Sequence, residues 1–238
     1  MKVLTWNILA SEWIDNETYR NIKKEIRNNK FRFERIIKYI TEQNASVILL
    51  QEVMPNEYKH LKLLFQENYL ITPLYSITWN KNKNKNKSGN VTLFKRSEFS
   101  VKYMKHVRLS FGIQTSCHYK NKICMIYNVH LSIATPHERY LQMNSIMKTL
   151  LDAEMCMICG DFNHQYMKRS AFYDLPNYTV HNTTCKTYYI GRRTNIDNIL
   201  SKGFKRFTTI VCPECPESDE EGMLQYGSDH LPISLVID

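Results

Sequence analysis

Short apolar runs that end in polar side chains are the main pattern along this chain. The clearest is Met155–Cys159, whose five consecutive apolar residues predict a strand buried on both faces. Gly160 ends this run, and Asp161 and Asn163 follow directly. Because a buried carboxylate or carboxamide loses hydration free energy unless it is paired, these side chains indicate a site for a metal ion, a phosphate or an activated water. The alternative is a simple turn, since Gly, Asp and Asn are common turn formers.

The first two strand candidates place polar groups at their ends in the same way. Residues 2–8 alternate, which puts Asn7 on the face opposite Trp6 at the end of an otherwise apolar strand. Residues 47–50 form a continuous apolar run that is followed by Gln51 and Glu52. Taken alone, Asn7 is explained equally well by a turn.

Later strand candidates carry acids and imidazoles. Residues 123–131 are the strongest apolar run after the central one, and Asn128 and His130 lie near its end. A histidine in such a run is also explained as a core residue with satisfied hydrogen bonds. Asp197 lies inside a strand-like run where an acid is unexpected, and Asp229 with His230 precedes an apolar strand over residues 231–237.

Helical spacing separates these strands. The apolar side chains of residues 33–40 follow an i, i+3, i+4, i+7 pattern, which predicts an amphipathic helix. Pro55 suits the start of a second helix, and Thr135–Glu138 combines a capping box with a proline at the first helical position. Helices that alternate with buried strands indicate α/β organisation.

Other segments have weaker patterns. We expect a surface helix or covering loop over residues 12–30, strands over residues 91–95 and 100–109, and a strand or connection over residues 202–211. Residues 80–90 alternate Lys with Asn and predict an exposed loop, which is either merely solvated or in contact with phosphates. Residues 214–225 are acidic and poor in apolar residues, so we expect a mobile loop there.

Composition narrows the class of protein. With 238 residues, 43% of them hydrophobic, the chain fits a single domain over residues 1–238, and no apolar stretch is long enough for a signal peptide or a membrane span. Seven cysteines without a disulfide-rich pattern favour an intracellular, cytoplasmic setting. The formal net charge of +9 indicates a polyanionic partner, although a Lys- and Asn-rich genome would give the same bias.

Two CxxC pairs argue only weakly for zinc. Cys156 and Cys159 lie within an apolar strand, where residues three apart point to opposite faces, so they cannot hold one ion together. Cys212 and Cys215 form a loop pair of unassigned role.

The polar groups become informative as a set, because strand ends in α/β proteins meet at one edge of a sheet, where ligands bind. Two carboxylates 5 Å apart repel by about 3 kcal/mol at an effective dielectric constant of 20. Several acids at one place therefore raise each other's pKa or need a cation. Oxygen donors from Asn, Asp and Glu suit Mg²⁺ or Mn²⁺. A cation with open coordination positions points to phosphoester chemistry.

The ordered motifs resemble the endonuclease/exonuclease/phosphatase superfamily. They are Trp6-Asn7, Gln51-Glu52-Val53, Asn128-Val-His130-Leu131, Gly160-Asp-Phe-Asn163, Ile196-Asp197 and Ser228-Asp-His230. Within it, the flanking residues are most similar to the branch that contains the deadenylases, nocturnin and the Angel proteins. The resemblance implies a DNase I-like α+β fold, in which two packed β-sheets are flanked by helices in a four-layer sandwich.

The resemblance also implies roles for individual residues. Glu52 is expected to be the principal ligand of Mg²⁺ or Mn²⁺, with Asn7 beside it and either Asp229 or the pair Asp161 and Asn163 completing one or two ion sites. Asp161 is expected to orient or deprotonate the attacking water, and Asn163 to hold the water and a phosphate oxygen. His230, oriented by Asp197, is expected to stabilise the scissile phosphate. The implied substrate contacts are Asn128, His130 and Asn163.

The function expected from the resemblance is a magnesium-dependent phosphodiesterase, a 3′-5′ exoribonuclease of the deadenylase type that acts on RNA as a monomer. A DNA end-processing or abasic-site nuclease of the same superfamily is the alternative. A phosphatase for a nucleotide or a phosphoinositide is less favoured by the charge. A catalytically inactive nucleic-acid-binding protein is disfavoured, because every motif residue is present.

Overall fold

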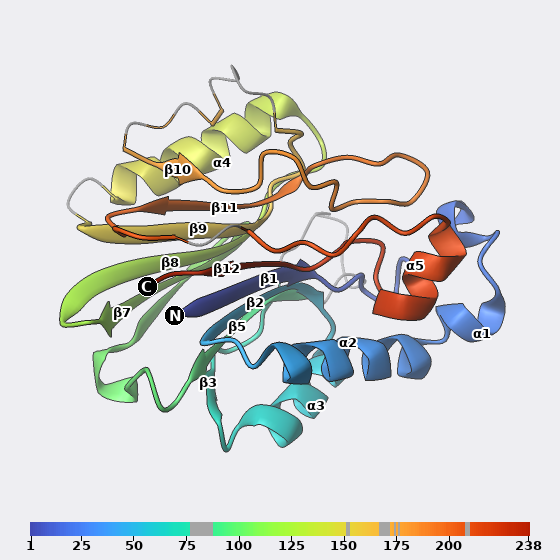
Figure 1. Cartoon of the computed structure of the whole chain (residues 1–238), viewed down its shortest axis with the longest axis horizontal. Helices are drawn as coiled ribbons and strands as arrows, with labels where there is room; N and C mark the ends of the chain where they lie inside the picture. Colours follow the sequence, from blue (N-terminus) through green and yellow to red (C-terminus); the bar gives the residue numbers. More distant parts are fainter. Residues whose placement is uncertain (77–87, 151–152, 167–171, 174, 176, 208–209) are drawn as a thin grey trace.

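Two β-sheets pack face to face, and helices cover their outer faces (Figure 1). The computed structural model describes residues 1–76, 88–150, 153–166, 172, 173, 175, 177–207 and 210–238. Helices α2 and α3 cover one outer face and α4 covers the other, whereas α1 and α5 lie at the end of the molecule away from the two termini. This four-layer arrangement confirms the fold class expected from the sequence.

The first sheet contains both ends of the chain. Its central strands are parallel: β1 (Lys2–Asn7) pairs with β2 (Val47–Val53), and β1 also pairs antiparallel with β12 (Ile233–Val236). The sheet continues through β5 (Gly89–Lys95), β3 (Tyr69–Ile71) and β4 (Tyr75–Ser76), in the order β12-β1-β2-β5-β3 with β4 beside β5.

The second sheet holds the central strand of the sequence pattern, β9 (Met155–Asp161). It runs parallel to β8 (Lys122–His130) and antiparallel to β11 (Asp197–Lys202). The order is β10-β11-β9-β8-β7-β6, where the remaining strands are β10 (Thr179–Val180), β7 (Gly112–Tyr119) and β6 (Lys105–Leu109).

The helices begin at residues that suit helix starts. Asn28 caps α2 (Asn29–Gln43) by accepting hydrogen bonds from two backbone N–H groups. Thr135 caps α4 (Pro136–Thr149), and α3 (Pro55–Phe65) begins at a proline, as predicted. The other helical elements are α1 (Lys24–Arg27), α5 (Asp219–Tyr226) and the 3₁₀ turns Glu17–Tyr19 and Val101–Tyr103. No helix in the described part of the chain has the length and apolar character needed to cross a membrane.

Strand alternation divides the core into three apolar layers. Leu4 and Trp6 of β1 face the helices of the first sheet, whereas Val3 faces the second sheet. In β9, Cys156 faces α4 and Cys159 faces the first sheet. The two cysteines therefore point to opposite faces, as predicted, and all seven cysteines of the chain are free thiols.

Several expectations for the weaker segments are wrong or incomplete. Residues 214–225 are not one mobile loop, because Ser218 caps α5 and Met223 and Tyr226 bury against the first sheet's helical layer. Residues 100–109 do not form one strand but a 3₁₀ turn followed by β6. Strand β7 was not predicted. Lys202 ends β11, and residues 203–207, 210 and 211 are a connection in which Phe207 and Val211 form isolated bridges. Most of the expected Lys/Asn loop, residues 80–87, lies outside the described residues.

We predict that Gly160→Ala strongly destabilises the protein. Gly160 has φ +142°, and a Cβ atom there would lie 2.0 Å from the carbonyl oxygen of Val129 on the neighbouring strand. Forcing extra atoms into a packed core costs about 1–3 kcal/mol, and a backbone obstacle places this change at the upper end. Gly191→Ala is the control, since Gly191 also has positive φ but open space around it. Urea unfolding should show the larger loss for Gly160→Ala, and equal losses would contradict the packing argument.

Candidate active site

The strand registers bring four of the predicted side chains to one end of the layer between the sheets. His130 lies opposite Asp161 in the parallel β8–β9 pair, and Asp161 lies opposite Asp197 in the β9–β11 pair. Their side chains follow the same alternation as the apolar residues of this layer, so they face the first sheet. Asn7 ends β1 on the facing sheet and meets Asp161 across the gap.

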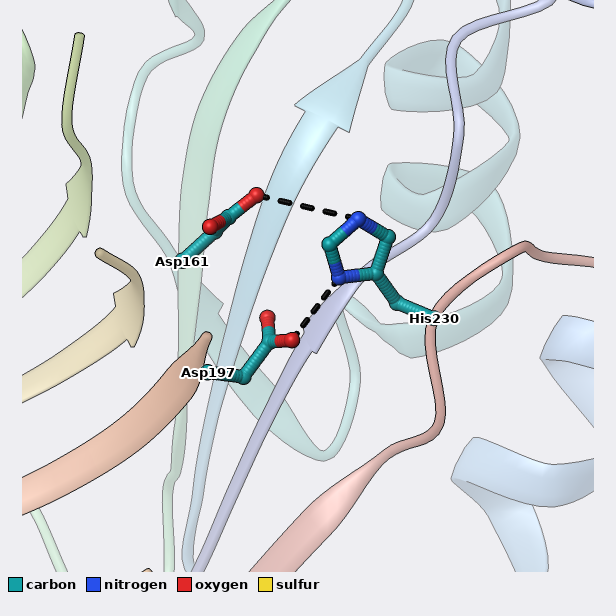
Figure 2. A group of neighbouring side chains, drawn as sticks. All are labelled: Asp161, Asp197 and His230. Carbon is teal, nitrogen blue, oxygen red and sulfur yellow. Dashed lines mark hydrogen bonds and ion pairs between the residues drawn. The ribbon is translucent and has the colours of Figure 1, made fainter. Parts of the chain in front are cut away.

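His230 lies between two carboxylates (Figure 2). Its Nδ1 atom is 2.8 Å from Asp197 Oδ2, and its Nε2 atom is 3.7 Å from Asp161 Oδ2. All three side chains are buried. The Asp197 carboxylate therefore fixes the orientation of the imidazole ring, so that Nε2 faces Asp161 and the cavity beyond it.

Asn7 joins the acids of the two sheets. Its Nδ2 atom donates to Glu52 Oε1 at 3.0 Å and to Asp161 Oδ2 at 3.1 Å, while its Oδ1 atom accepts from the backbone N–H of Leu9. The backbone N–H of Ala10 donates to the second oxygen of Glu52 at 2.9 Å. The Glu52 carboxylate is thus held on both oxygens beside Asp161.

Glu52 reaches this place through an irregularity in β2. The register between β2 and β5 shifts between Leu50 and Val53, and Glu52 has φ 60°, a left-handed conformation that is unusual for this residue. Strict alternation would put Glu52 on the helix-covered face with Leu50. The bulge instead turns its carboxylate toward Asn7.

Asn163 is also held in a left-handed conformation, with φ 47°. Its backbone N–H donates to Asp161 Oδ1 at 2.8 Å, and its Nδ2 atom donates to the carbonyl oxygen of Leu131 at 3.0 Å. The turn after β9 therefore locks Asp161 and Asn163 together and ties both to the residue that follows His130.

Asp229 approaches the same region from the C-terminal segment. Tyr19 donates a hydrogen bond of 2.7 Å to Asp229 Oδ2. The Ser228 hydroxyl donates to the carbonyl oxygen of Asn7 at 2.6 Å and accepts from the backbone N–H of His230 at 3.2 Å. This links the end of β1 directly to the Asp229–His230 pair.

Burial and mutual charge set the electrostatics of the site. Burial is the main cause that raises the pKa of Asp161, and the neighbouring Asp197 carboxylate raises it further. Burial likewise raises the pKa of Asp229. Burial opposes the charged form of His230, but Asp197, Asp229 and Asp161 together raise its pKa well above the ordinary value. An imidazolium among carboxylates is the form these surroundings favour.

A buried arginine supports the site from behind. Arg32 of α2 is 1% exposed and donates to the carbonyl oxygens of Leu9 and Gly227, at 2.6 Å and 2.8 Å. These carbonyls belong to the chain segments that follow Asn7 and precede Asp229. Its positive charge also lowers the pKa of Asp229, against the effect of burial.

The site opens into a cavity of about 630 Å³. Six predicted residues line it, namely Glu52, His130, Asp161, Asn163, Asp229 and His230. His130 Nε2 lies 3.6 Å from Asp161 Oδ2 and 3.9 Å from Glu52 Oε1, so it completes the floor. Asn7 and Asp197 lie behind this floor and act on it through hydrogen bonds.

The structure places Asn128 differently from the expectation. Asn128 is not among the residues that line the cavity and is 1% exposed in the layer between the sheets. Its amide group donates to the carbonyl oxygens of Leu50 and Val91 and accepts from Gln51 and Asn90. Because its polar atoms are engaged inside the protein, we replace the expected substrate contact with a role in joining the sheets.

The cavity walls contain residues that the sequence patterns did not single out. One wall comes from residues 9–19, including Trp13 and Tyr19, and another from residues 188–196, including Tyr188 and Arg192. Ile133, 74% exposed, lies at the rim. These two segments have no clear helix or strand periodicity. The one signal in the sequence is that both are rich in aromatic and polar residues.

The donor set suits a hard divalent cation. Glu52, Asp161 and Asp229 offer carboxylate oxygens around one cavity, and Asp161, Asp197 and His230 bring possible ligand atoms within 4.8 Å of one another. Asp197 Oδ1 is buried without a hydrogen-bond partner among the described residues. Oxygen-rich sites without thiolates bind Mg²⁺ or Mn²⁺ in preference to softer ions.

The architecture and this centre define a DNase I-like α+β sandwich with a hydrolase-type site at one end of the layer between its sheets. The chain belongs to the endonuclease/exonuclease/phosphatase family, whose model matches residues 4–230. Members of this family are metal-dependent hydrolases that include nucleases and phosphodiesterases. The family resemblance found in the sequence is thereby confirmed.

Solved structures share the fold at low sequence identity. A humanized D. rerio TDP2 superposes with a TM-score of 0.71 at 14% identity, over 99% of this chain and 97% of that one. D. rerio TDP2 with a single-strand DNA product gives a TM-score of 0.70 at 14% identity, over 100% and 98%. The human nocturnin catalytic domain with bound sulfate gives 0.67 at 18% identity, over 100% and 94%. No curated protein sequence matches the chain.

We predict that Asn128→Ala lowers stability and leaves substrate affinity nearly unchanged. The substitution removes the hydrogen bonds of the Asn128 side chain to Gln51, Asn90 and the carbonyl oxygens of Leu50 and Val91, which join the sheets. Each unsatisfied buried group costs about 1–3 kcal/mol, so we expect a loss of about 2–4 kcal/mol in urea unfolding. The exposed Asn56 of α3 gives the control Asn56→Ala. A several-fold rise in KM without a loss of stability would restore the substrate-contact role of Asn128.

Proposed function

We propose that this protein is a magnesium-dependent phosphodiesterase, a 3′-5′ exoribonuclease of the deadenylase type that hydrolyses RNA. The observation that supports it most is the His230 ring held by Asp197 and facing Asp161 on the floor of a cavity that Glu52 also lines. The net charge of +9 favours a polyanionic substrate. The flanking residues that resemble the deadenylase branch favour RNA.

In this proposal Asp161 positions the attacking water. Its Oδ2 atom faces both His130 and His230, and its Oδ1 atom is fixed by the backbone N–H of Asn163. A carboxylate oxygen held in this way can accept a proton from a water in the cavity. The Asn163 turn lies beside it and would contact the water and a phosphate oxygen.

His230 stabilises the negative charge that develops on the phosphate. Asp197 keeps the imidazole ring oriented and favours its protonated form, so Nε2 can donate a hydrogen bond toward the cavity. His130 supplies a second imidazole beside the same oxygen of Asp161 and would contact the phosphate or the leaving oxygen.

Glu52, Asp161 and Asp229 would hold the Mg²⁺ or Mn²⁺ ion, with Asn7 beside them. When bound, the ion would neutralise phosphate charge and favour departure of the leaving oxygen. The chain's own contribution is to hold Glu52 on both oxygens, through Asn7 and the backbone of Ala10, so that the carboxylate is oriented in advance. All three carboxylates line the same cavity.

A DNA end-processing nuclease is the alternative. The fold similarity to D. rerio TDP2, a protein whose structure holds a single-strand DNA product, is as strong as the similarity to nocturnin. A nucleotide or phosphoinositide phosphatase fits the charge less well. The single domain over residues 1–238, the monomeric state and an intracellular, cytoplasmic location remain part of the proposal, the last supported by the seven free thiols.

A cleavage panel tests the proposal. Labelled poly(A), mixed-sequence RNA, single- and double-stranded DNA, an abasic duplex and inositol phosphates are incubated with Mg²⁺, with Mn²⁺ or with EDTA. We expect a ladder of products shortened from the 3′ end of RNA, abolished by EDTA. Preferential cleavage of DNA ends or abasic sites would select the alternative, and no cleavage of any phosphoester would refute the proposed activity.

We predict that His230→Ala and Asp197→Asn each lower the cleavage rate by a factor of about 10²–10³, the usual loss when one electrostatic partner of a transition state is removed. Both should keep the wild-type circular dichroism spectrum. His118→Ala changes an exposed histidine that stacks on Tyr103 and should retain full activity. Near-wild-type rates in His230→Ala would show that the reaction centre lies elsewhere.

A further inference from the structure

Tyr19 reaches the reaction centre from a segment that the sequence pattern identified only as a cover. Its hydroxyl donates to Asp229 Oδ2 at 2.7 Å, and the two side chains are buried. Tyr19 ends the 3₁₀ turn Glu17–Tyr19, more than two hundred residues from Asp229 in the chain. Such a contact fixes both the segment and the acid.

The Asp229 carboxylate depends on this contact for its orientation. In the described part of the chain, the only other side-chain polar atom within hydrogen-bond distance is the Ser228 hydroxyl oxygen, 3.5 Å from Oδ1, and the single proton of that hydroxyl is donated to the carbonyl oxygen of Asn7. The Tyr19 bond is far shorter and, as a bond to an ionised group, belongs to the strong class. Tyr19 therefore occupies Oδ2 and leaves Oδ1 with only the long Ser228 contact.

The segment that carries Tyr19 also forms a wall of the cavity. Trp13, Asn16 and Thr18 line the cavity together with Tyr19. The segment is fastened outside the site, because Lys23 forms an ion pair of 2.9 Å with Glu220 of α5. A substrate in the cavity would touch the same segment whose tyrosine holds Asp229.

We propose that Tyr19 is a positioning residue for the reaction: it orients the Asp229 carboxylate toward the cation and couples this orientation to the wall formed by residues 13–19. This inference rests on the proposed function, since it assigns Asp229 to the cation. Tyr19 itself neither transfers a proton nor contacts the reacting phosphate.

Tyr19→Phe tests the role, because it removes the hydroxyl and keeps the ring. Tyr69→Phe is the matched control: Tyr69 is 5% exposed against 6% for Tyr19, and its hydroxyl donates to the carbonyl oxygen of Ala45 at 2.9 Å. Tyr69 lies on β3, at the end of the strand order of the first sheet, and does not line the cavity. We expect Tyr19→Phe to lower kcat by about tenfold with KM within twofold of the wild type. Both variants should lose similar thermal stability.

A second readout does not need activity. Thermal unfolding is measured with and without Mn²⁺, and the stabilisation by Mn²⁺ reports cation affinity for the folded protein. We expect a smaller Mn²⁺-dependent rise in Tm for Tyr19→Phe than for the wild type or Tyr69→Phe. An inactive wild-type protein that Mn²⁺ still stabilises would refute the proposed function alone, and the Tyr19 comparison would remain decisive.

A double variant shows whether Tyr19 acts through Asp229 or only stabilises the fold. If Tyr19 acts through Asp229, the double variant Tyr19→Phe/Asp229→Asn should show the same Mn²⁺-dependent Tm shift as Asp229→Asn alone. Additive losses would overturn the proposal, as would an unchanged Mn²⁺ shift in Tyr19→Phe. If Tyr19→Phe does not fold, Tyr19→Trp and Tyr19→His replace it. Their Mn²⁺-dependent Tm shifts are then compared with that of the wild type.

Discussion

The polar contact between the two sheets is the interaction on which the rest of this structure depends. The layer between the sheets is apolar along most of its length, and hydrophobic packing alone would let the sheets slide over one another. Asn128 and Gln51 prevent this, because Asn128 bonds to β2 and β5 while Gln51 bonds both to Asn128 and to Thr5 of β1. Directional bonds in a buried layer fix one register. The sheet ends that carry Asn7 and His130 are thereby held opposite each other.

The charges of the buried acids and imidazoles are the second constraint on the site. Four carboxylates and two imidazoles meet at the polar end of the layer, and burial there raises the pKa of Asp161 and Asp229. Neutral donors restrain the acids: Asn7 bridges Glu52 and Asp161, and the Tyr19 hydroxyl holds Asp229. Asn7 and Tyr19 therefore orient these acids without adding a charge of their own. Arg32, placed behind the floor, supplies a positive charge on the protein side.

Strand alternation explains why part of this site was predictable. Asn7, His130, Asp161 and Asp197 all lie where a period of two places them, so strand alternation puts their side chains in the layer between the sheets. The same rule fails for Glu52, whose bulge reverses its face, and for Asn128, where a polar residue at a strand end serves the core. Helix α5 escaped prediction because its acidic first turn looks like a loop, although Met223 and Tyr226 bury it. The cavity walls were not predictable. The segment that contains Tyr19 has only a weak pattern, and such a pattern does not show that its tyrosine contacts Asp229, far along the chain.

The two left-handed residues at the centre show how the fold and the site are linked. A non-glycine residue in this conformation costs about 1–3 kcal/mol and persists only where its surroundings over-determine it. Glu52 is over-determined by hydrogen bonds to Asn7 and Ala10, and Asn163 by its bonds to Asp161 and Leu131. Glu52 is held by β1 and the segment that follows it in the first sheet, and Asn163 is held by β9 and the residue that follows β8 in the second, so each strained residue is fixed within its own sheet. The contact between the sheets then joins these two parts, because Asn7 of the first sheet donates both to Glu52 and to Asp161 of the second. The reaction centre is therefore built from two locally fixed halves that the packing of the sheets brings together.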